Sequence, residues 1–348
     1  MPSSLSNYIP EVIVEQILLH LPSTTLVRFT SVSKSWLSLI SSLSFTLQRS
    51  FSNPKNPSLL LIHRSQPFSP STTFTTTPPP YSTPHPFSLR FIGSLYGVVC
   101  FIEQSIGHDH AITLFNPSIR SYLRLQTPAV KHTALGFGFD SYNTDFKLIR
   151  IFNRVELYSL NQGFWRCIHC PYRKLQELQF SNTQCFLHGN VHWVVSHSYV
   201  TNSFVLIFNM EQEKFKKMSF PPNLVLDALC TLQLKVTVIE GYLSVLDCCG
   251  IWMMREYGVA ESWTKMFNLD LERGCISKVF GFRSSAIVLM LLHKKGEISL
   301  HSFDTKTQEI KDLRIKGEII AACEDIGSLV LLDRISCPVS KSQDKRRR

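Results

Sequence analysis

A hairpin-like pattern that recurs along most of the chain is the feature that most constrains the fold. Each copy begins with an apolar pair, passes through a polar turn residue, and returns to aromatic or apolar positions after four or five more residues. The copies are separated by 43, 50, 45 and 50 residues, measured from Phe115, Tyr158, Phe208, Met253 and Phe303. A four-stranded sheet that recurs about every 40–50 residues is typical of propeller blades. The spacing therefore predicts a mainly-β, propeller-like domain.

A second pattern, glycine followed by alternating apolar residues, supports this prediction. It starts at Gly97, Gly189, Gly241 and Gly327. The first three copies precede a hairpin copy by 12–19 residues, as the inner strands of a blade precede its outer strands. Residues 137–151 occupy the same place before the second hairpin. The two patterns together describe whole blades.

The copy at Gly327 is followed by no hairpin, so it needs another partner. We expect residues 328–332 to pair with an early predicted strand, residues 59–63, and to close the ring as a mixed sixth blade. Closure of this kind removes exposed sheet edges, which otherwise promote aggregation. The propeller-like domain, residues 59–335, is therefore predicted to have about six blades.

Residues 1–50 differ from the rest because they are predicted to form three short helices. Ile13, Ile17 and Leu21 lie four residues apart and share one face of the first helix. Pro10 suits the first position of that helix, where its missing N–H would have no partner in any case. A segment of fewer than about 40 residues rarely buries a core of its own. We therefore expect the head to be a docking module whose apolar face is completed by another protein.

Three further segments are predicted to lie outside the folded parts. Residues 51–58 turn to Asn, Pro, Lys and Ser and are interpreted as a linker. Residues 67–86 are dense in Pro, Ser and Thr, which favours an exposed, partly disordered loop. Residues 336–348 form a basic tail. A nuclear-import or nucleic-acid contact is one interpretation of this tail, and a solvated, disordered terminus is the other.

Composition narrows the class of protein. The chain has 348 residues, is 44% hydrophobic and carries a net charge of +10, but five of its cations lie in the last eight residues, so the body is only mildly basic. Such a body permits an acidic partner without requiring one. Its ten cysteines lack the spacing of a disulfide framework, and the start of the chain lacks the pattern of a signal peptide. We expect an intracellular protein of the cytoplasm or nucleus, neither secreted nor bound in a membrane.

Two pairs of residues have the spacing of metal ligands. Cys167 and Cys170 form half of a zinc site, but no second pair follows at a suitable distance. His188 and His192 are four residues apart, yet the intervening Gly189 predicts a hairpin turn rather than a helix. Neither pair is therefore expected to bind a metal. Since no nucleophile elbow or phosphate-binding loop is present in the sequence, we expect no catalytic residues and no cofactor.

The head carries a set of short motifs that resembles a known family. They are Ile9-Pro10, Leu21-Pro22, Leu26-x-Arg28-Phe29, Val32-Ser33-Lys34-Ser35-Trp36 and Leu39-Ile40. This set resembles the F-box, the adaptor-binding motif of SCF-type ubiquitin ligases. The resemblance implies that the head binds a Skp-type adaptor and, through it, a cullin scaffold. Combined with the helical face, it implies that the adaptor is contacted by Ile9, Pro10, Ile13, Ile17, Leu21, Leu26, Val32, Lys34 and Trp36.

Motifs in the rest of the chain resemble a companion domain. They are Asn116-Pro-Ser-x-Arg120, Gly136-Phe-Gly-Phe-Asp140, Trp165-Arg166, Gly189-Asn-Val-His-Trp193 and Gly258-Val-Ala-Glu-Ser-Trp263. Over residues 90–332 the chain resembles the F-box-associated, kelch-like interaction domain of plant F-box proteins.

The two resemblances together imply a non-catalytic substrate receptor. Such a receptor brings an unknown protein target to ubiquitination and proteasomal degradation. Three alternatives remain open: a protein-binding propeller that acts outside a ligase, with less support a nucleic-acid-binding protein, and with the least support an enzyme.

Overall fold

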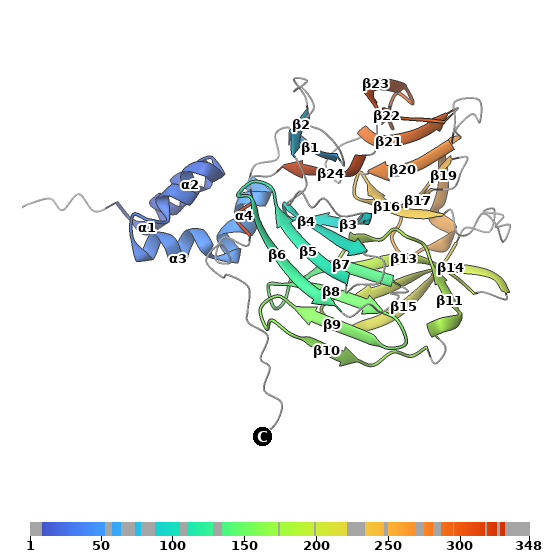
Figure 1. The fold of residues 1–348 in the computed structure, drawn as a ribbon, viewed down its shortest axis with the longest axis horizontal. Coiled ribbons are helices and arrows are strands. Elements are labelled where there is room, and N and C mark those ends of the chain that lie inside the picture. Colours follow the sequence, from blue (N-terminus) through green and yellow to red (C-terminus); the bar gives the residue numbers. More distant parts are fainter. Residues whose placement is uncertain are drawn as a thin grey trace, which may run out of the picture.

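The structure is a computed structural model in which a small helical head lies beside a larger ring of β-sheets (Figure 1). It describes residues 9–52, 58–63, 74–77, 88–104, 110–127, 134–172, 175–197, 200–220, 234–246, 250–268, 275–280, 287–294, 296–316, 319–325 and 328–330. The predicted combination of an all-α head and a mainly-β, propeller-like domain is confirmed.

Four helices form the head, one more than predicted. They are α1 (Glu11–Leu19), α2 (Ser23–Phe29), α3 (Lys34–Ser41) and α4 (Leu43–Ser52). The extra helix, α4, runs past residue 50 into the predicted linker. It is rich in Ser and Thr, which are weak helix formers, so its sequence gave little signal. Tertiary packing stabilises α4 instead, because Phe45, Thr46 and Arg49 are buried against the rest of the molecule.

Five blades, numbered here in chain order, make up most of the ring. Their strands are β3 (Ser88–Leu95), β4 (Val98–Gln104), β5 (His110–Asn116) and β6 (Ser121–Thr127); β7 (Ala134–Asp140), β8 (Asp145–Ile151), β9 (Val155–Ser159) and β10 (Trp165–Ile168); β11 (Leu178–Phe180), β12 (Cys185–Leu187), β13 (Asn190–His197), β14 (Val200–Asn209) and β15 (Lys214–Ser219); β16 (Lys235–Ile239), β17 (Tyr242–Leu246), β18 (Gly250–Met254) and β19 (Trp263–Asn268); and β20 (Cys275–Phe280), β21 (Ile287–Lys294), β22 (Glu297–Asp304) and β23 (Ile310–Lys316). The hairpins β5–β6, β9–β10, β14–β15, β18–β19 and β22–β23 coincide with the five copies of the recurring pattern.

A three-stranded sheet closes the ring, but one of its strands is not the predicted one. Strand β1 (Ser58–His63) pairs in antiparallel fashion with β24 (Ile319–Asp325), whereas the prediction paired it with residues 328–332. Residues 328–330 are not in a strand. Both segments are short and apolar, so periodicity cannot decide which of them enters the sheet. Five full blades and this smaller sheet agree with the prediction of about six blades.

The third strand of the closing sheet lies inside the predicted loop of residues 67–86. Strand β2 (Phe74–Thr77) pairs in parallel with β1, and Leu59 lies opposite Phe74 in the register. The high Ser, Thr and Pro content of this region predicted a loop. However, the Phe-Thr-Thr-Thr run has strong β-propensity, which the edge of an existing sheet can use. The loop prediction is wrong for these four residues.

The turns at one end of the blades together form one edge of the ring. We call this edge the head rim, because the head packs against its turn between β5 and β6. In an antiparallel blade, the turn between the first two strands and the turn between the last two lie at the same end. At the turn between β12 and β13, His188 and Gly189 both have positive φ, at 50° and 73°. Two-residue hairpins of this kind require positive φ at both positions. Gly97 and Gly241 have positive φ as well, so three glycines of the second sequence pattern, Gly97, Gly189 and Gly241, mark hairpin turns, whereas Gly327 lies outside the described residues.

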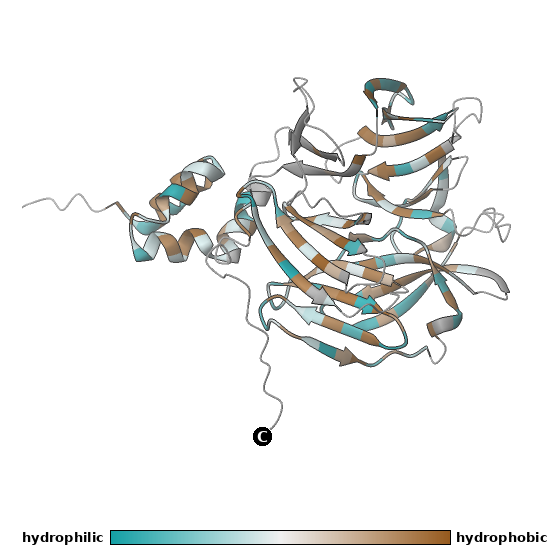
Figure 2. Ribbon diagram, viewed as in Figure 1, coloured by the Kyte–Doolittle hydropathy of each residue, from teal (hydrophilic) through white to brown (hydrophobic). Residues whose placement is uncertain are grey.

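Apolar side chains form shared cores between neighbouring blades. Figure 2 shows that hydrophobic residues recur along the strands of the blades. Between blades two and three the approach is close, because a Cβ atom added to Gly136 would lie 2.5 Å from the indole ring of Trp193. That indole donates a hydrogen bond from Nε1 to the Leu135 carbonyl oxygen at 3.1 Å. The glycine motif of β7 thus serves blade packing. No helix in the described ranges is both long and apolar enough to span a membrane.

Candidate functional site

Helix α1 has apolar residues around much of its surface, and only some of them are covered. Leu18 and Leu19, near its C-terminal end, lie in the core of the head, where both are almost fully buried. Val12, Ile13 and Ile17 are open to solvent, with exposed fractions of 68%, 52% and 52%. Contiguous exposed apolar side chains of this kind mark an interaction surface. We call the exposed apolar residues of the head, Ile9, Val12, Ile13, Ile17, Val32 and Leu37, the outer face.

Most residues of the predicted adaptor-contact set lie at the surface. Those exposed to solvent are Ile9, Pro10, Ile13, Ile17, Val32 and Lys34. Leu21 and Trp36 are half-buried, and the Trp36 ring lies 5.4 Å from the Phe29 ring inside the head. Leu26 has no exposed surface, so it differs from the prediction by supporting the head from within.

Two residues of the outer face, Val12 and Leu37, were absent from the predicted set. Val12 is one position away from the predicted stripe of Ile13 and Ile17, and it is more exposed than either. The prediction followed a single helical stripe. A short helix with apolar residues on more than one side was the available signal, because such a helix cannot bury all of them internally.

A buried cation holds the helices of the head together. Arg49 on α4 donates hydrogen bonds through Nη1 to the carbonyl oxygen of Leu19, at 3.3 Å, and to that of Leu21. These oxygens lie at or just beyond the end of α1, where carbonyl groups lack helical partners and cations are favoured. Burial lowers the pKa of Arg49, but an arginine remains charged at neutral pH. Helix α1, which carries Val12, Ile13 and Ile17 of the outer face, is therefore tied to α4.

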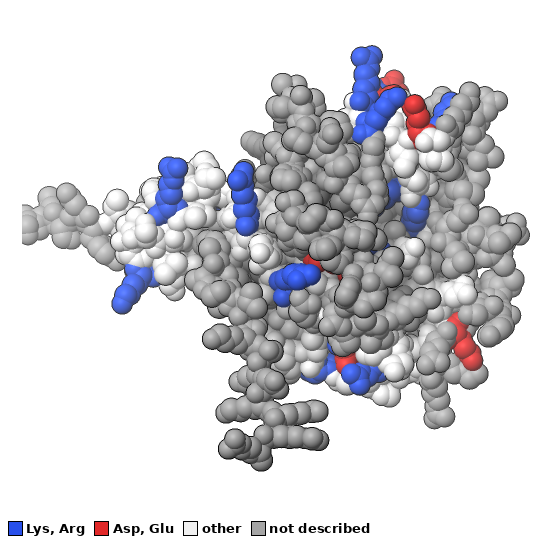
Figure 3. All heavy atoms as spheres, in the orientation of Figure 1, with Lys and Arg blue, Asp and Glu red and all other residues white. Residues whose placement is uncertain are grey.

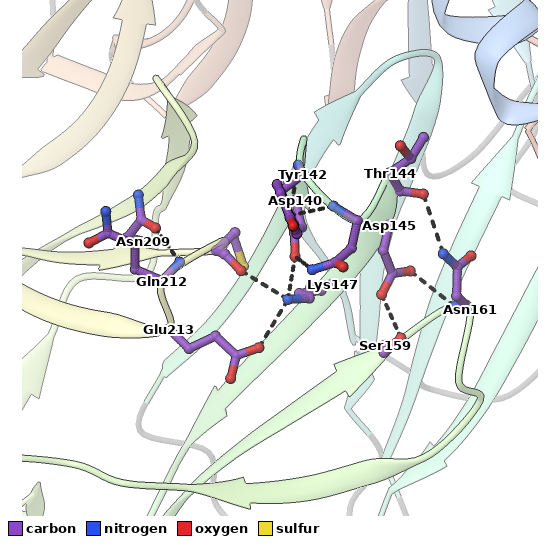
Figure 4. Close-up of polar contacts among 12 residues, drawn as sticks. Asp140, Tyr142, Thr144, Asp145, Lys147, Ser159, Asn161, Asn209, Gln212 and Glu213 are labelled. Atoms are coloured by element: carbon purple, nitrogen blue, oxygen red, sulfur yellow. Dashed lines mark hydrogen bonds and ion pairs between the residues drawn. The ribbon is translucent and has the colours of Figure 1, made fainter.

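A charged network lies buried between blades two and three (Figure 4). Lys147 donates hydrogen bonds through Nζ to Asp140 Oδ2 at 2.6 Å, to Glu213 Oε1 at 3.0 Å and to the Met210 carbonyl oxygen at 3.0 Å. Arg166 donates to the same Glu213 oxygen. Because Lys147 belongs to β8 and Glu213 to the turn before β15, the network ties the two blades together.

The titration of these groups follows from their pairing. Burial by itself raises the pKa of Asp140, but hydrogen bonds from Asn143 and Lys147 outweigh it and hold this pKa below its ordinary value. The pKa of Glu213 is likewise lowered, because bonds from Arg166 and Lys147 outweigh its burial. Burial lowers the pKa of Lys147, yet its two carboxylate partners raise it overall. All three groups are charged at neutral pH and engaged with one another, which suits a structural role better than proton transfer.

The two pairs with metal-ligand spacing occupy different surroundings. His192 is fully buried with Nε2 2.7 Å from the Tyr257 hydroxyl, and burial lowers its pKa to about 4. His188 lies in the neighbouring turn, where its ring meets the edge of Tyr257. Cys167 and Cys170 are free thiols, one exposed and one half-buried. Within the described ranges, no group of three or more His, Cys, Asp or Glu side chains is arranged to hold a metal ion.

Comparison with known families agrees with this architecture. Residues 8–48 match the F-box domain, and residues 71–320 match the F-box associated beta propeller domain. The first match covers α1 to α3 and the first part of α4. The second covers the five blades and part of the closing sheet.

Several Arabidopsis thaliana proteins are similar over most of their length. The F-box/kelch-repeat protein At3g23880 is 24% identical over 309 residues, which cover 75% of this chain and 79% of that protein. The F-box protein CPR1 is 25% identical over 359 residues, covering 88% of this chain and 84% of that protein. The F-box protein At3g07870 is 25% identical over 373 residues, covering 89% and 88%.

The propeller match alone spans well over half of the chain. The F-box match precedes it, just as the helical head precedes the blades along the chain. The chain therefore belongs to the plant F-box proteins that carry an F-box associated β-propeller domain.

Proposed function

We propose that the protein is the substrate-recognition subunit of an SCF-type ubiquitin ligase. The observation that carries the proposal is the outer face of the head, in which α1 exposes Val12, Ile13 and Ile17 although its Leu18 and Leu19 already pack in the head core. Burying a fully exposed aliphatic side chain contributes about 1.5–3 kcal/mol, so each half-exposed residue offers about 1 kcal/mol to a partner. The head thus presents half of an interface, and a Skp-type adaptor is the partner that an F-box implies.

In this role the protein contributes position and no bond-making chemistry. The adaptor would join the head to a cullin scaffold, and the propeller would hold a protein target. Attachment of two partners to one rigid body turns their encounter into an intramolecular event with a high effective concentration. Ubiquitin transfer would then be catalysed by the partner subunits. The side of the head seen in Figure 3 shows basic side chains among neutral ones, whereas helix α1 carries two acidic residues, Glu11 and Glu15, and no basic one.

The substitution Ile17→Glu tests the adaptor contact. It replaces an exposed apolar side chain of the outer face by a charge and should leave the head folded, because Ile17 is half exposed. We expect adaptor affinity to fall about tenfold or more, since 1.4 kcal/mol corresponds to a factor of ten and a charge is desolvated as well. Gln16→Glu is the matched control: it adds the same charge at a neighbouring exposed position without removing apolar surface.

The measurement is titration of the full chain with purified adaptor, followed by capture of cullin. Equal affinity of Ile17→Glu and the wild type would refute the proposed contact. Adaptor binding without cullin capture would instead favour a protein-binding propeller that acts outside a ligase. We also propose an intracellular location, in the cytoplasm, the nucleus or both, which fractionation of the tagged chain would test.

A further inference from the structure

The cores of the head and the propeller are interlocked at the head rim. Ile119, in the turn between β5 and β6, packs against the core of the head. In the opposite direction, Leu47 of α4 packs against the core between blades one and two. Side chains therefore cross the boundary both ways. A flexible tether between two independent domains would make no such contacts.

A short segment after the last strand occupies the same boundary. Leu329 is 2% exposed and belongs to the core of the head, together with Leu18 and Leu26. The adjacent Val330 is 7% exposed and belongs to the core between blades one and two. One three-residue segment, Ser328–Val330, which we call the clamp, thus contributes to both cores at once.

Asn116, at the end of β5, holds the clamp in place. Its side chain is fully buried, and Nδ2 donates hydrogen bonds to the carbonyl oxygens of Ser328, at 3.0 Å, and Val330, at 2.8 Å. The side-chain Oδ1 accepts from the Ser118 backbone N–H at 3.0 Å, which orders the turn that carries Ile119. Both polar atoms of the Asn116 side chain are therefore engaged. Oδ1 orders the turn beneath the head, and Nδ2 binds the clamp.

We propose that the clamp fixes the orientation of the head on the propeller, with Asn116 and Leu329 as its positioning residues. The fixed orientation of the head does not depend on the proposed function; only its consequence for a ligase rests on that function. If the head binds an adaptor, a fixed head places every target held by the propeller at one distance and angle from the ligase machinery. Because Arg49 ties α4 to the end of α1, the constraint at α4 extends to the outer face.

The substitution Asn116→Asp isolates the clamp. Aspartate has the same shape and can still accept from the Ser118 N–H, but it has no donors for the two clamp carbonyls and sets a carboxylate against them. Asn209→Asp is the matched control. Asn209 has the equivalent position in blade three, where Oδ1 accepts from the Gln212 N–H at 2.6 Å and Nδ2 donates to Asn190. Both of these side-chain hydrogen bonds stay within blade three.

The readout is the distance distribution between one label on the head and one on the propeller in the full chain. Ser38 on α3 and Lys216 on β15 are exposed and suit labelled non-natural amino acids, which avoid the exposed thiol of Cys167. We expect one narrow peak for the wild type and for Asn209→Asp. For Asn116→Asp we expect the narrow peak to be lost to a broad distribution, while circular dichroism shows the blades intact.

Leu329→Ala provides an independent perturbation that leaves the turn at Asn116 unchanged, and Leu329→Met should restore the narrow peak because it nearly conserves volume. Narrow distributions in folded Asn116→Asp and Leu329→Ala would overturn the proposal. A broad distribution in the wild type would overturn it as well, even if neither variant folded.

The consequence for the ligase is tested separately. In a complex with adaptor and cullin, mass spectrometry of self-ubiquitinated lysines should show a few sites in the wild type and a wider spread in Asn116→Asp. Failure to capture the adaptor would contradict the proposed function and leave the distance measurement as the test of the clamp. Adaptor capture with equal distributions and equal lysine patterns would contradict the clamp alone.

Discussion

Removal of the Lys147 ammonium group at the junction of blades two and three should destabilise the propeller by leaving a buried carboxylate unpaired. In the variant Lys147→Met, the aliphatic stem is largely kept and the ammonium group is lost. The Lys147 side chain is 6% exposed and that of its partner Asp140 is fully buried. The substitution therefore leaves a buried carboxylate without its cation.

The size of the effect depends on what Asp140 retains. Loss of one partner from a buried ion pair costs about 3–5 kcal/mol when nothing compensates. Asp140 keeps hydrogen bonds from the backbone N–H groups of Tyr142 and Asn143, each at 3.0 Å, and from Asn143 Nδ2 at 2.8 Å. Because these donors still stabilise the charge, we expect a loss of about 2–4 kcal/mol for Lys147→Met, below the full range.

Urea denaturation, followed by tryptophan fluorescence, measures this loss. The matched control is Lys316→Met, which removes a cation from Glu297 in an ion pair of similar length, 2.9 Å, but with both side chains 69% exposed. Surface pairs of this kind contribute little, so no resolvable change is expected for the control. If both variants shift the midpoint equally, or if neither does, burial is not what makes the Lys147 network important.

Two other predictions concern His192 and the core of the head. Burial lowers the pKa of His192 from 6.5 to about 4, so on acidification the unfolded chain binds a proton at this residue before the folded chain does. The free energy of unfolding should therefore decline as the pH falls from 6.5 to about 4, and His192→Gln should make this part of the pH profile flatter. In the head, Leu26→Ala should cost about 2–5 kcal/mol by leaving a cavity, whereas Ile13→Ala should weaken adaptor binding without a comparable loss of stability. Thermal unfolding and adaptor titration of the two head variants separate these effects. Equal thermal shifts for Leu26→Ala and Ile13→Ala would contradict the assigned positions.

The candidate sites show which structural features can be predicted from the amino-acid sequence and which cannot. The stripe of Ile13 and Ile17 was visible because a helical face is a local property of the chain. Whether Leu26 points inward or outward depends on how three helices pack, so the motif alone placed it in the contact set although it is fully buried. The contact of Lys147 and Asp140 with Glu213 could not be predicted from the sequence for a similar reason. These residues come from two blades that are adjacent only in the folded ring.

Segments with weak or ambiguous local signals depended on their surroundings in the same way. Helix α4 has poor intrinsic propensity and is stabilised by the burial of Phe45 and Arg49. Strand β2 lies in a stretch with loop-like composition and exists because β1 offers it an edge. Both were missed because local preference is weak where tertiary packing supplies the free energy.

Three helices of the head, the repeating blades and the positions of the five outer hairpins could be predicted from the amino-acid sequence, because each depends on periodicity and turn chemistry within a few residues. The closure of the ring and the attachment of the head depend on tertiary packing. Two apolar segments, residues 319–325 and 328–330, compete for the same partner in the sequence, and no local property separates them. Packing at the closure of the ring separates them. The backbone of β24 forms hydrogen bonds with that of β1, and the clamp, through Leu329, covers the apolar boundary beneath the head.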